Sequence, residues 1–173
     1  MVYVQHYDSP LGDLLLASDE TALIGLWIED GRFFAETLPA KCLQQETHVL
    51  AETKRWLDVY FSGEEPDFMP PLNPAGSEFR QAVWRFLLDI PYGQTTTYGA
   101  IADSLAKQRG VANMSAQAVG GAVGHNEISI IIPCHRVVGA NGNLTGYGSG
   151  LNNKIKLLQL EGVDTSRYFL PKG

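Results

Sequence analysis

The fold is decided by nine consecutive residues, Ile130-Ile131-Ile132-Pro133-Cys134-His135-Arg136-Val137-Val138. The β-branched apolar run before the proline predicts a buried strand, which we place at 128–132. Pro133 has no backbone N–H to donate, so strand pairing should stop at or near it. A thiol, an imidazole and a guanidinium follow at once, and reactive side chains at the end of a rigid element are typical of a functional site.

Cys134 has two interpretations. Most cysteines outside disulfides are small buried hydrophobes. A nucleophilic cysteine instead needs a nearby base or positive group that favours its thiolate, and His135 and Arg136 supply both. Neighbouring side chains of an extended chain point to opposite faces, so direct contact between Cys134 and His135 requires a turn. Without a turn, a bridging water must carry the proton.

Glu161 is the candidate partner of the imidazole, because a histidine base needs its second nitrogen held, preferably by a carboxylate. It follows the predicted helix 153–160 and precedes Gly162, a typical helix terminator. A carboxylate at this end opposes the helix dipole, so stability alone does not explain it. A solvated surface glutamate is the alternative. The combination of Cys134, His135 and Glu161 favours a catalytic site.

The composition is that of an ordinary globular protein, with 173 residues of which 45% are hydrophobic and 18% charged. This length suits one or two domains. No apolar run approaches the roughly 20 residues of a membrane helix, and the N-terminus does not resemble a signal peptide. We therefore expect a cytoplasmic protein with no membrane partner. Cys42 and Cys134 should then both be thiols, and since their spacing fits no zinc pattern we expect neither metal nor cofactor.

Charge is distributed unevenly along the chain, although the net charge is −6. Residues 1–78 carry 4 Lys+Arg against 14 Asp+Glu, a balance of −10, whereas residues 79–173 carry 9 against 5, a balance of +4. Such a chain can offer DNA its basic half and keep the acidic half away.

The N-terminal half predicts a small antiparallel sheet followed by a helix. Short apolar stretches separated by turn residues indicate strands at 2–7, 14–17 and 22–27. Helical periodicity indicates a helix at 46–61. A proline-rich linker follows, so we expect domains at 1–76 and 77–173. His6 and His48, the two histidines of this half, are interpreted as structural or solvated residues.

The C-terminal half predicts three helices, at 77–90, 98–106 and 116–124. The second and third are joined by a short connection and indicate a helix-turn-helix, with 116–124 as the recognition helix. That helix is almost bare, by which we mean that nearly all its side chains are small or absent, and Gln117 is its one long polar side chain. Tight internal packing and close approach to DNA explain the small residues equally well. Asn126, which follows, can bond backbone groups and tie this helix to the cysteine segment.

These motifs together identify a family. Pro133–Val137, Asn126, Gly146-Tyr147-Gly148-Ser149-Gly150 and Leu157–Gly162 resemble the O6-alkylguanine-DNA alkyltransferases, also called methylated-DNA–protein-cysteine methyltransferases. Ile90–Gly93 and Thr97-Tyr98 are also similar to the family pattern, and the match spans 77–163. The resemblance implies an α+β protein, with an N-terminal ribonuclease-H-like antiparallel sheet and helix and a mostly helical C-terminal domain that contains the helix-turn-helix.

The resemblance also implies a function. A monomer would bind the minor groove of duplex DNA, flip out O6-alkylguanine and transfer the alkyl group irreversibly to Cys134, because the alkylated oxygen is out of reach inside the stack. His135 would take the thiol proton through a water, oriented by Glu161. The implied substrate-binding residues are Asn126, Val137, Tyr147, Gly148 and Ser149, where Tyr147 would donate a hydrogen bond to the guanine oxygen. The implied DNA-binding residues are Thr97, Tyr98, Ser115, Ala116 and Gln117.

One position departs from the family pattern, because many members have an arginine where this sequence has Gln117. Glutamine is neutral and shorter, but it still bonds the edge of an orphaned base. Tyr147 as a plain surface residue stays open as an alternative. The rival functions are a lesion-binding module without chemistry, a DNA-binding regulator switched by methylation of Cys134, and a thiol hydrolase with repeated turnover.

Overall fold

The computed structural model describes residues 1–29, 34–142, 144 and 150–168. By its contacts the chain divides into two compact units. Unit 1 contains Met1–Ala75 and the short segment Glu127–Ser129, and unit 2 contains Gly76–Asn126 and Ile130–Gly173. The domain boundary between 76 and 77 stays a proposal. None of the helices in the described part of the chain is long and apolar enough to cross a membrane.

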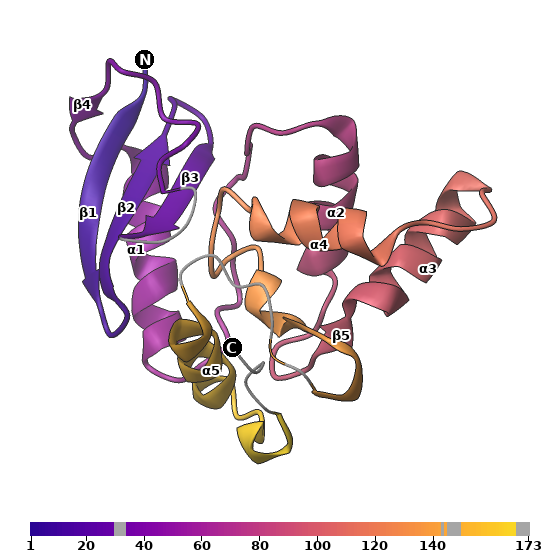
Figure 1. Ribbon diagram of the computed structural model, residues 1–173. Coiled ribbons are helices and arrows are strands. Elements are labelled where there is room, and N and C mark those ends of the chain that lie inside the picture. The colour runs from indigo at the N-terminus through magenta and orange to yellow at the C-terminus, as the bar shows by residue number, and fades with distance from the viewer. Residues whose placement is uncertain (30–33, 143, 145–149, 169–173) are drawn as a thin grey trace. The chain divides into compact units, whose positions relative to one another are not determined.

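Unit 1 is built on a four-stranded sheet with the order β3-β2-β1-β4 (Figure 1). Its strands are β1 (Tyr3–Ser9), β2 (Gly12–Ser18), β3 (Leu23–Ile28) and β4 (Leu43–Gln44). The first three are antiparallel, in a register that places Leu15 beside both His6 and Trp27. The three strands predicted from the sequence are therefore confirmed. The two-residue β4, which pairs parallel with β1, is too short to leave a pattern.

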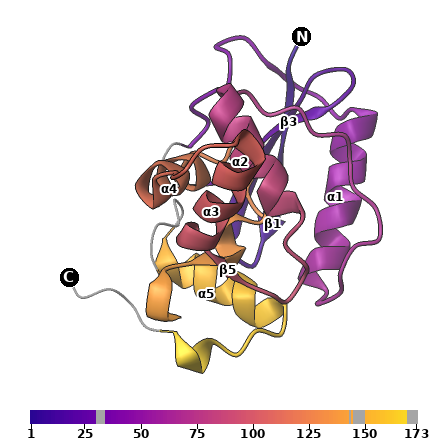
Figure 2. The same ribbon diagram turned by 90° about the vertical axis from the view of Figure 1, so that its right-hand side faces the viewer.

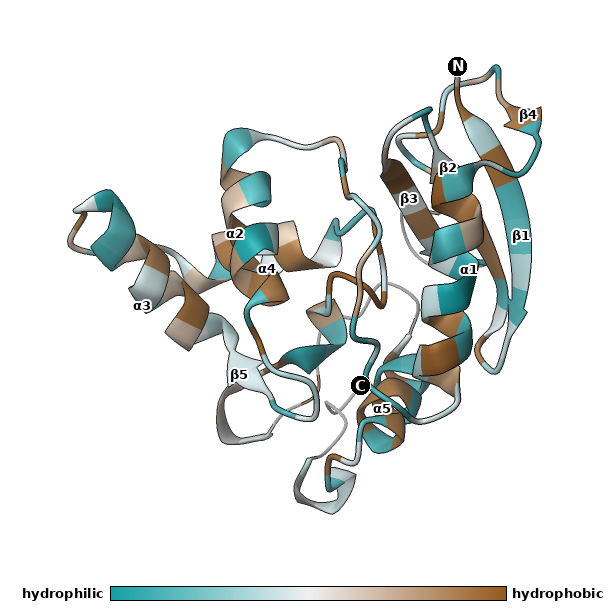
Figure 3. Cartoon of the chain, turned by 180° about the vertical axis from the view of Figure 1, so that it is seen from behind, coloured by the Kyte–Doolittle hydropathy of each residue, from teal (hydrophilic) through white to brown (hydrophobic). Residues whose placement is uncertain are grey.

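The two faces of this sheet are covered differently. Helix α1 (His48–Phe61) packs against β1, β2 and β3, and its start is fixed by Thr47, whose Oγ1 accepts from the Leu50 N–H at 3.1 Å. The opposite face holds the cluster of Val4, Leu15, Ala17 and Trp27, against which Leu38 and Cys42 pack. Burial on both sides explains why β3 is mostly hydrophobic, whereas β1, whose residues are nearly all exposed or half-buried, is mostly hydrophilic (Figure 3).

Unit 2 is mostly helical, as the sequence predicts. Its helices are α2 (Glu78–Leu88), α3 (Tyr98–Arg109), α4 (Ala116–Gly124) and α5 (Leu151–Leu160), with single helical turns at Ala140–Gly142 and Thr165–Arg167. Helix α4 packs against α2 and α3 (Figure 2). A short parallel pair, β5 (Thr96–Thr97) with β6 (Val137–Val138), joins the start of α3 to the cysteine segment.

The strand predicted at 128–132 is wrong. Ile130, Ile131 and Ile132 are buried, but the chain there runs through turns, and Ile128 makes a single parallel bridge with Leu26. Ile130 has a φ of 71°, in the left-handed region, which interrupts an extended chain. A short apolar run predicts that its residues are buried. Hydrophobic periodicity alone does not distinguish a strand from a buried turn.

Trp84 of α2 provides a test of how unit 2 is held together. Its indole N–H donates to the Ala122 carbonyl in the last turn of α4 at 2.9 Å, and both residues are buried. Replacing Trp84 by Phe leaves that carbonyl without this donor, so Trp84→Phe should lower the free energy of unfolding by about 1–3 kcal/mol. Urea denaturation of the whole chain measures it. Trp56→Phe, which alters a buried indole stacked on Tyr60, is the matched control, and equal losses would contradict the prediction.

Candidate active site

The backbone turns sharply at the thiol. Pro133 has φ −83° and ψ 65°, and the Cys134 N–H donates to the Ile132 carbonyl at 2.8 Å, which makes an inverse γ-turn. Cys134–Arg136 then forms one 3₁₀ turn, closed by the Arg136 N–H on the Pro133 carbonyl at 3.0 Å. A turn of this kind is what the sequence analysis found necessary for direct contact between the Cys134 and His135 side chains. Cys134 is only 6% exposed.

Glu161 is the centre of a buried hydrogen-bond network. Its Oε2 lies 2.5 Å from His135 Nε2, and its Oε1 accepts from Arg136 Nε at 2.8 Å and from the Gly93 N–H at 3.0 Å. The Glu161 side chain is fully buried. The solvated surface glutamate considered above is therefore not what the chain forms. Both carboxylate oxygens are held, which fixes the plane of the carboxylate against the imidazole.

The charge states in this network follow from burial and hydrogen bonding. Burial raises the pKa of Glu161, but the bonds and charges of His135 and Arg136 outweigh it and lower that pKa to about 2. Burial lowers the pKa of His135 further than Glu161 raises it, so the imidazole is neutral at pH 7. With Nε2–H donating to Glu161, the lone pair of the ring remains on Nδ1. Nδ1 is thus the nitrogen that can accept a proton.

Lys154 is a buried residue of this site that the sequence analysis did not identify. It lies on α5, is fully buried, and interacts electrostatically with Cys134. Burial lowers the pKa of Lys154 to about 8, against the attraction of the Cys134 thiolate. Lys154 is therefore still mainly an ammonium at pH 7 and favours that thiolate. The signal was present in the spacing, because Lys154, Leu157, Leu158 and Glu161 follow one another at helical intervals on one face.

Strain is concentrated just before the cysteine. A β-branched residue with positive φ, as at Ile130, is rare and costs on the order of 1–3 kcal/mol. Asn126 Nδ2 donates to the Ile132 carbonyl at 2.8 Å and so closes the segment between them. This is the backbone tie expected of Asn126, made to a turn and not to a strand.

Of the other residues predicted to bind the substrate, only Val137 can be placed. It is buried in β6, where it pairs with Thr96. Tyr147, Gly148 and Ser149 lie outside the described residues.

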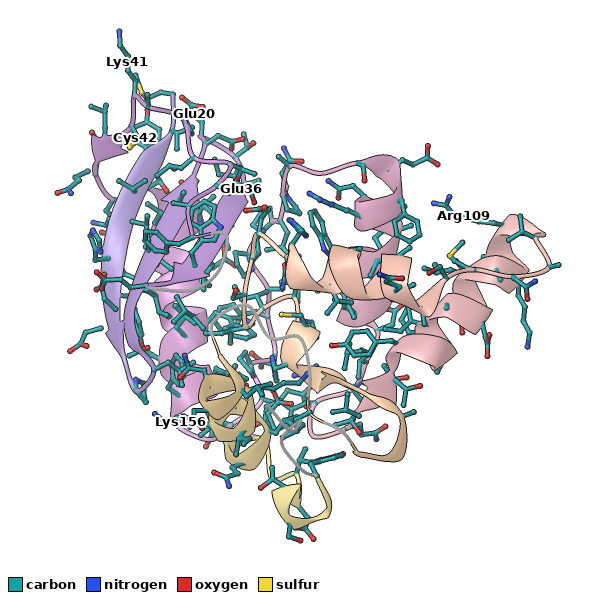
Figure 4. The ribbon with its side chains drawn as sticks, viewed as in Figure 1. Glu20, Glu36, Lys41, Cys42, Arg109 and Lys156 are labelled. Carbon is teal, nitrogen blue, oxygen red and sulfur yellow. The ribbon has the colours of Figure 1, made fainter. Side chains whose placement is uncertain are left out.

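Metal binding and the state of the cysteines were also predicted. Among the residues that are described, no group of three or more His, Cys, Asp or Glu side chains could hold a metal ion. Cys42 and Cys134 are both thiols, and Cys42 lies beside Lys41 just before β4 (Figure 4).

The two helices of the helix-turn-helix begin at capping residues that were predicted to bind DNA. Thr97 Oγ1 accepts from the Ala100 N–H and Ser115 Oγ from the Ala118 N–H, each at 3.1 Å. Tyr98, the first residue of α3, is half-buried. These caps explain where α3 and α4 start, and they leave other backbone N–H groups of the first turns for a partner.

Helix α4 presents a bare, exposed face. Its exposed residues are Ala116, Gln117, Ala118 and Gly121. A Cβ built on Gly121 would meet nothing within 4 Å, so packing inside the protein does not require a glycine there. Gly120 differs, because its Cβ would come within 3.8 Å of the Tyr98 ring. Basic side chains lie at the far end of α3, where Arg109 sits over the Phe79 ring at 5.6 Å (Figure 4).

Family models cover most of the chain. The model of the 6-O-methylguanine DNA methyltransferase ribonuclease-like domain matches residues 2–74, and that of the DNA-binding domain of the same methyltransferase matches residues 78–163.

Related proteins are similar over nearly their whole length. The methylated-DNA–protein-cysteine methyltransferase of Methanosarcina acetivorans is 44% identical over 93% of this chain and 99% of its own. That of Mycobacterium leprae is 43% identical over 93% of each chain. The crystal structure of Mycobacterium tuberculosis OGT in complex with DNA superposes with a TM-score of 0.79 at 42% identity, over 96% of this chain and 94% of that one. This chain therefore belongs to the family of methylated-DNA–protein-cysteine methyltransferases.

Proposed function

We propose that this protein repairs duplex DNA by moving the alkyl group of O6-alkylguanine onto Cys134, once per molecule. The observation that supports this most directly is the buried network in which Glu161 holds the imidazole of His135, the residue that follows Cys134 in one 3₁₀ turn. The relatives named as methylated-DNA–protein-cysteine methyltransferases, and the DNA complex of the Mycobacterium tuberculosis protein, support the same reaction.

The first step is loss of the thiol proton. Nδ1 of His135 takes it, directly or through a water, and the resulting imidazolium is stabilised by the ionised Glu161. Arg136 and the Gly93 N–H hold Glu161 in place and do not take part in the proton transfer. The Lys154 ammonium favours the thiolate that is formed.

The second step is an in-line displacement. The Cys134 thiolate attacks the alkyl carbon, a carbon–sulfur bond forms, and the carbon–oxygen bond breaks with its electron pair going to guanine O6. A hydrogen-bond donor, for which we propose Tyr147, stabilises the charge on that oxygen, and a proton then completes the guanine. The thioether has no route back to a thiol in this site, so each molecule reacts once.

DNA binding is assigned to the bare face of α4. We propose that it enters the minor groove, where the open space at Gly121 lets the two backbones approach, while Tyr98 promotes flipping and Gln117 contacts the orphaned base. The protein acts as a monomer in this proposal. The cytoplasm suits it, since Cys134 reacts only while it is a reduced thiol.

The rival reading, a lesion-binding module without chemistry, does not explain this site. A module that only binds has no use for a buried thiol that interacts electrostatically with a buried lysine and precedes an imidazole held by an ionised carboxylate. Buried charges are costly, and their presence together points to a reaction that needs them.

The central prediction concerns stoichiometry. Mixing the protein with a duplex that contains one O6-methylguanine should add the mass of a single methyl group to each protein molecule, and peptide mapping should place it on Cys134. Cys134→Ser should gain no mass. Cys42→Ser, which removes the other thiol, should still gain one methyl. Continued consumption of lesions beyond one per protein would contradict the proposal.

A second prediction concerns Glu161. In Glu161→Gln the amide no longer stabilises the imidazolium, and the single-turnover rate should fall by ~10²-fold or more. Glu64→Gln, which changes an exposed glutamate, is the control and should react like the wild type. Because the substitution also leaves Arg136 without its counter-charge, circular dichroism must show that the variant is folded. An unchanged rate in folded Glu161→Gln would contradict the assigned role.

A third prediction concerns the position that departs from the family pattern. Gln117→Arg adds one positive charge on the exposed face of α4, so binding to undamaged duplex should tighten at low salt. The slope of log affinity against log salt should become more negative by about 0.9. The matched control is Gln45→Arg, which adds the same charge at an exposed position of unit 1. If both variants change the slope equally, α4 is not the DNA-binding helix.

A further inference from the structure

The chain enters unit 1 for three residues just before the cysteine segment. Glu127–Ser129 belong to unit 1, whereas the residues on either side belong to unit 2. The segment pairs with β3, because the Leu26 N–H donates to the Glu127 carbonyl and the Ser129 N–H donates to the Leu26 carbonyl, each at 2.9 Å. Leu26 and Ile128 form the parallel bridge between them. Strand β3 is an edge of the sheet, so this segment occupies backbone groups that would otherwise be open.

The side chain of Glu127 fixes the segment a second time. Glu127 is 2% exposed, and its Oε2 accepts from the Trp27 indole N–H at 2.9 Å and from the Thr37 hydroxyl at 3.3 Å. A buried carboxylate needs such donors, and no part of the proposed chemistry uses it. We call this pair of contacts, Trp27 to Glu127 and Leu26 to residues 127–129, the clasp.

Gly25 makes room for the clasp. Gly25 and Trp27 point to the same face of β3, and the indole folds back over the glycine. A Cβ on Gly25 would lie 2.0 Å from the indole ring, which is closer than any real contact. The glycine therefore allows the indole to lie where its N–H reaches Glu127.

The chain between the clasp and the thiol has little freedom. Ser129 is followed by Ile130 in the left-handed conformation, by two buried isoleucines and by the γ-turn at Pro133. Asn126, the residue before the segment, donates a hydrogen bond from its side-chain amide to the Ile132 carbonyl. A displacement of 127–129 is thus passed along a constrained backbone to Cys134, five residues after Ser129.

We infer that Trp27 and Glu127 are positioning residues for alkyl transfer, which hold the start of the cysteine segment so that the Cys134 sulfur meets the alkyl carbon in line. The inference rests on the proposed function. It assigns to unit 1 a role in the rate of the reaction at a thiol that unit 1 does not contain.

The test separates DNA binding from reaction. Single-turnover methylation of wild type, Trp27→Phe and Glu127→Leu is measured over a range of O6-methylguanine duplex concentrations. Each variant removes one side of the Trp27–Glu127 hydrogen bond. The maximal rate should fall about tenfold in both, since small misplacements of reacting atoms are costly, while the duplex affinity stays within about twofold and the final stoichiometry stays one methyl per protein. The double variant should be no slower than the slower single variant.

Two further variants distinguish positioning from general stability. Glu127→Gln keeps an oxygen that can accept from the indole, and it should restore most of the rate. Trp56→Phe alters another buried indole of unit 1 and should react at the wild-type rate. If Trp27→Phe and Glu127→Leu are folded and react as fast as wild type, or if only duplex affinity falls, the inference is wrong. If the wild type itself takes up no methyl group, the proposed function fails instead.

Discussion

One buried carboxylate determines how the active site is arranged. Glu161 is ionised inside the protein, where an uncompensated charge would be very costly. The cost is offset because the carboxylate accepts from a guanidinium and an imidazole side chain and from a backbone N–H. These partners come from distant parts of unit 2, so the carboxylate can be buried only when the whole unit is folded around it.

The same constraint explains the geometry of the surrounding elements. Arg136 must point toward Glu161, and its second contact, to the Ile90 carbonyl at 2.7 Å, joins the turn after α2 to the cysteine segment. Gly93, with a φ of 77°, turns the chain so that its N–H reaches the carboxylate, and a Cβ there would lie 3.1 Å from the Glu161 carbonyl. The Ile90–Gly93 stretch of the family pattern is thus part of the support for Glu161 and not only a helix terminator.

The sequence predicted the elements whose signals are local. Helices α1 to α4 follow from periodicity, and Glu161 followed from the oddity of a carboxylate at a helix end. The strand at 128–132 was predicted wrongly because a left-handed isoleucine depends on tertiary contacts that a propensity scale does not contain. The burial of Lys154 was missed because lysine is nearly always exposed, although its place on the same helical face as Leu157, Leu158 and Glu161 was a signal. The return of Glu127–Ser129 to unit 1 is a long-range pairing with no local signal at all.

In the proposed reaction, the charges around Cys134 favour its thiolate. When Cys134 is a thiolate and His135 is neutral, the positive charges of Arg136 and Lys154 balance the negative charges of Glu161 and Cys134. Such a balance matters in a buried site because water screens the charges poorly there. In the same proposal, Glu161 stabilises the imidazolium that forms at His135, while the charges of Arg136 and Lys154 favour passing its proton on to the oxygen that departs from the alkyl carbon.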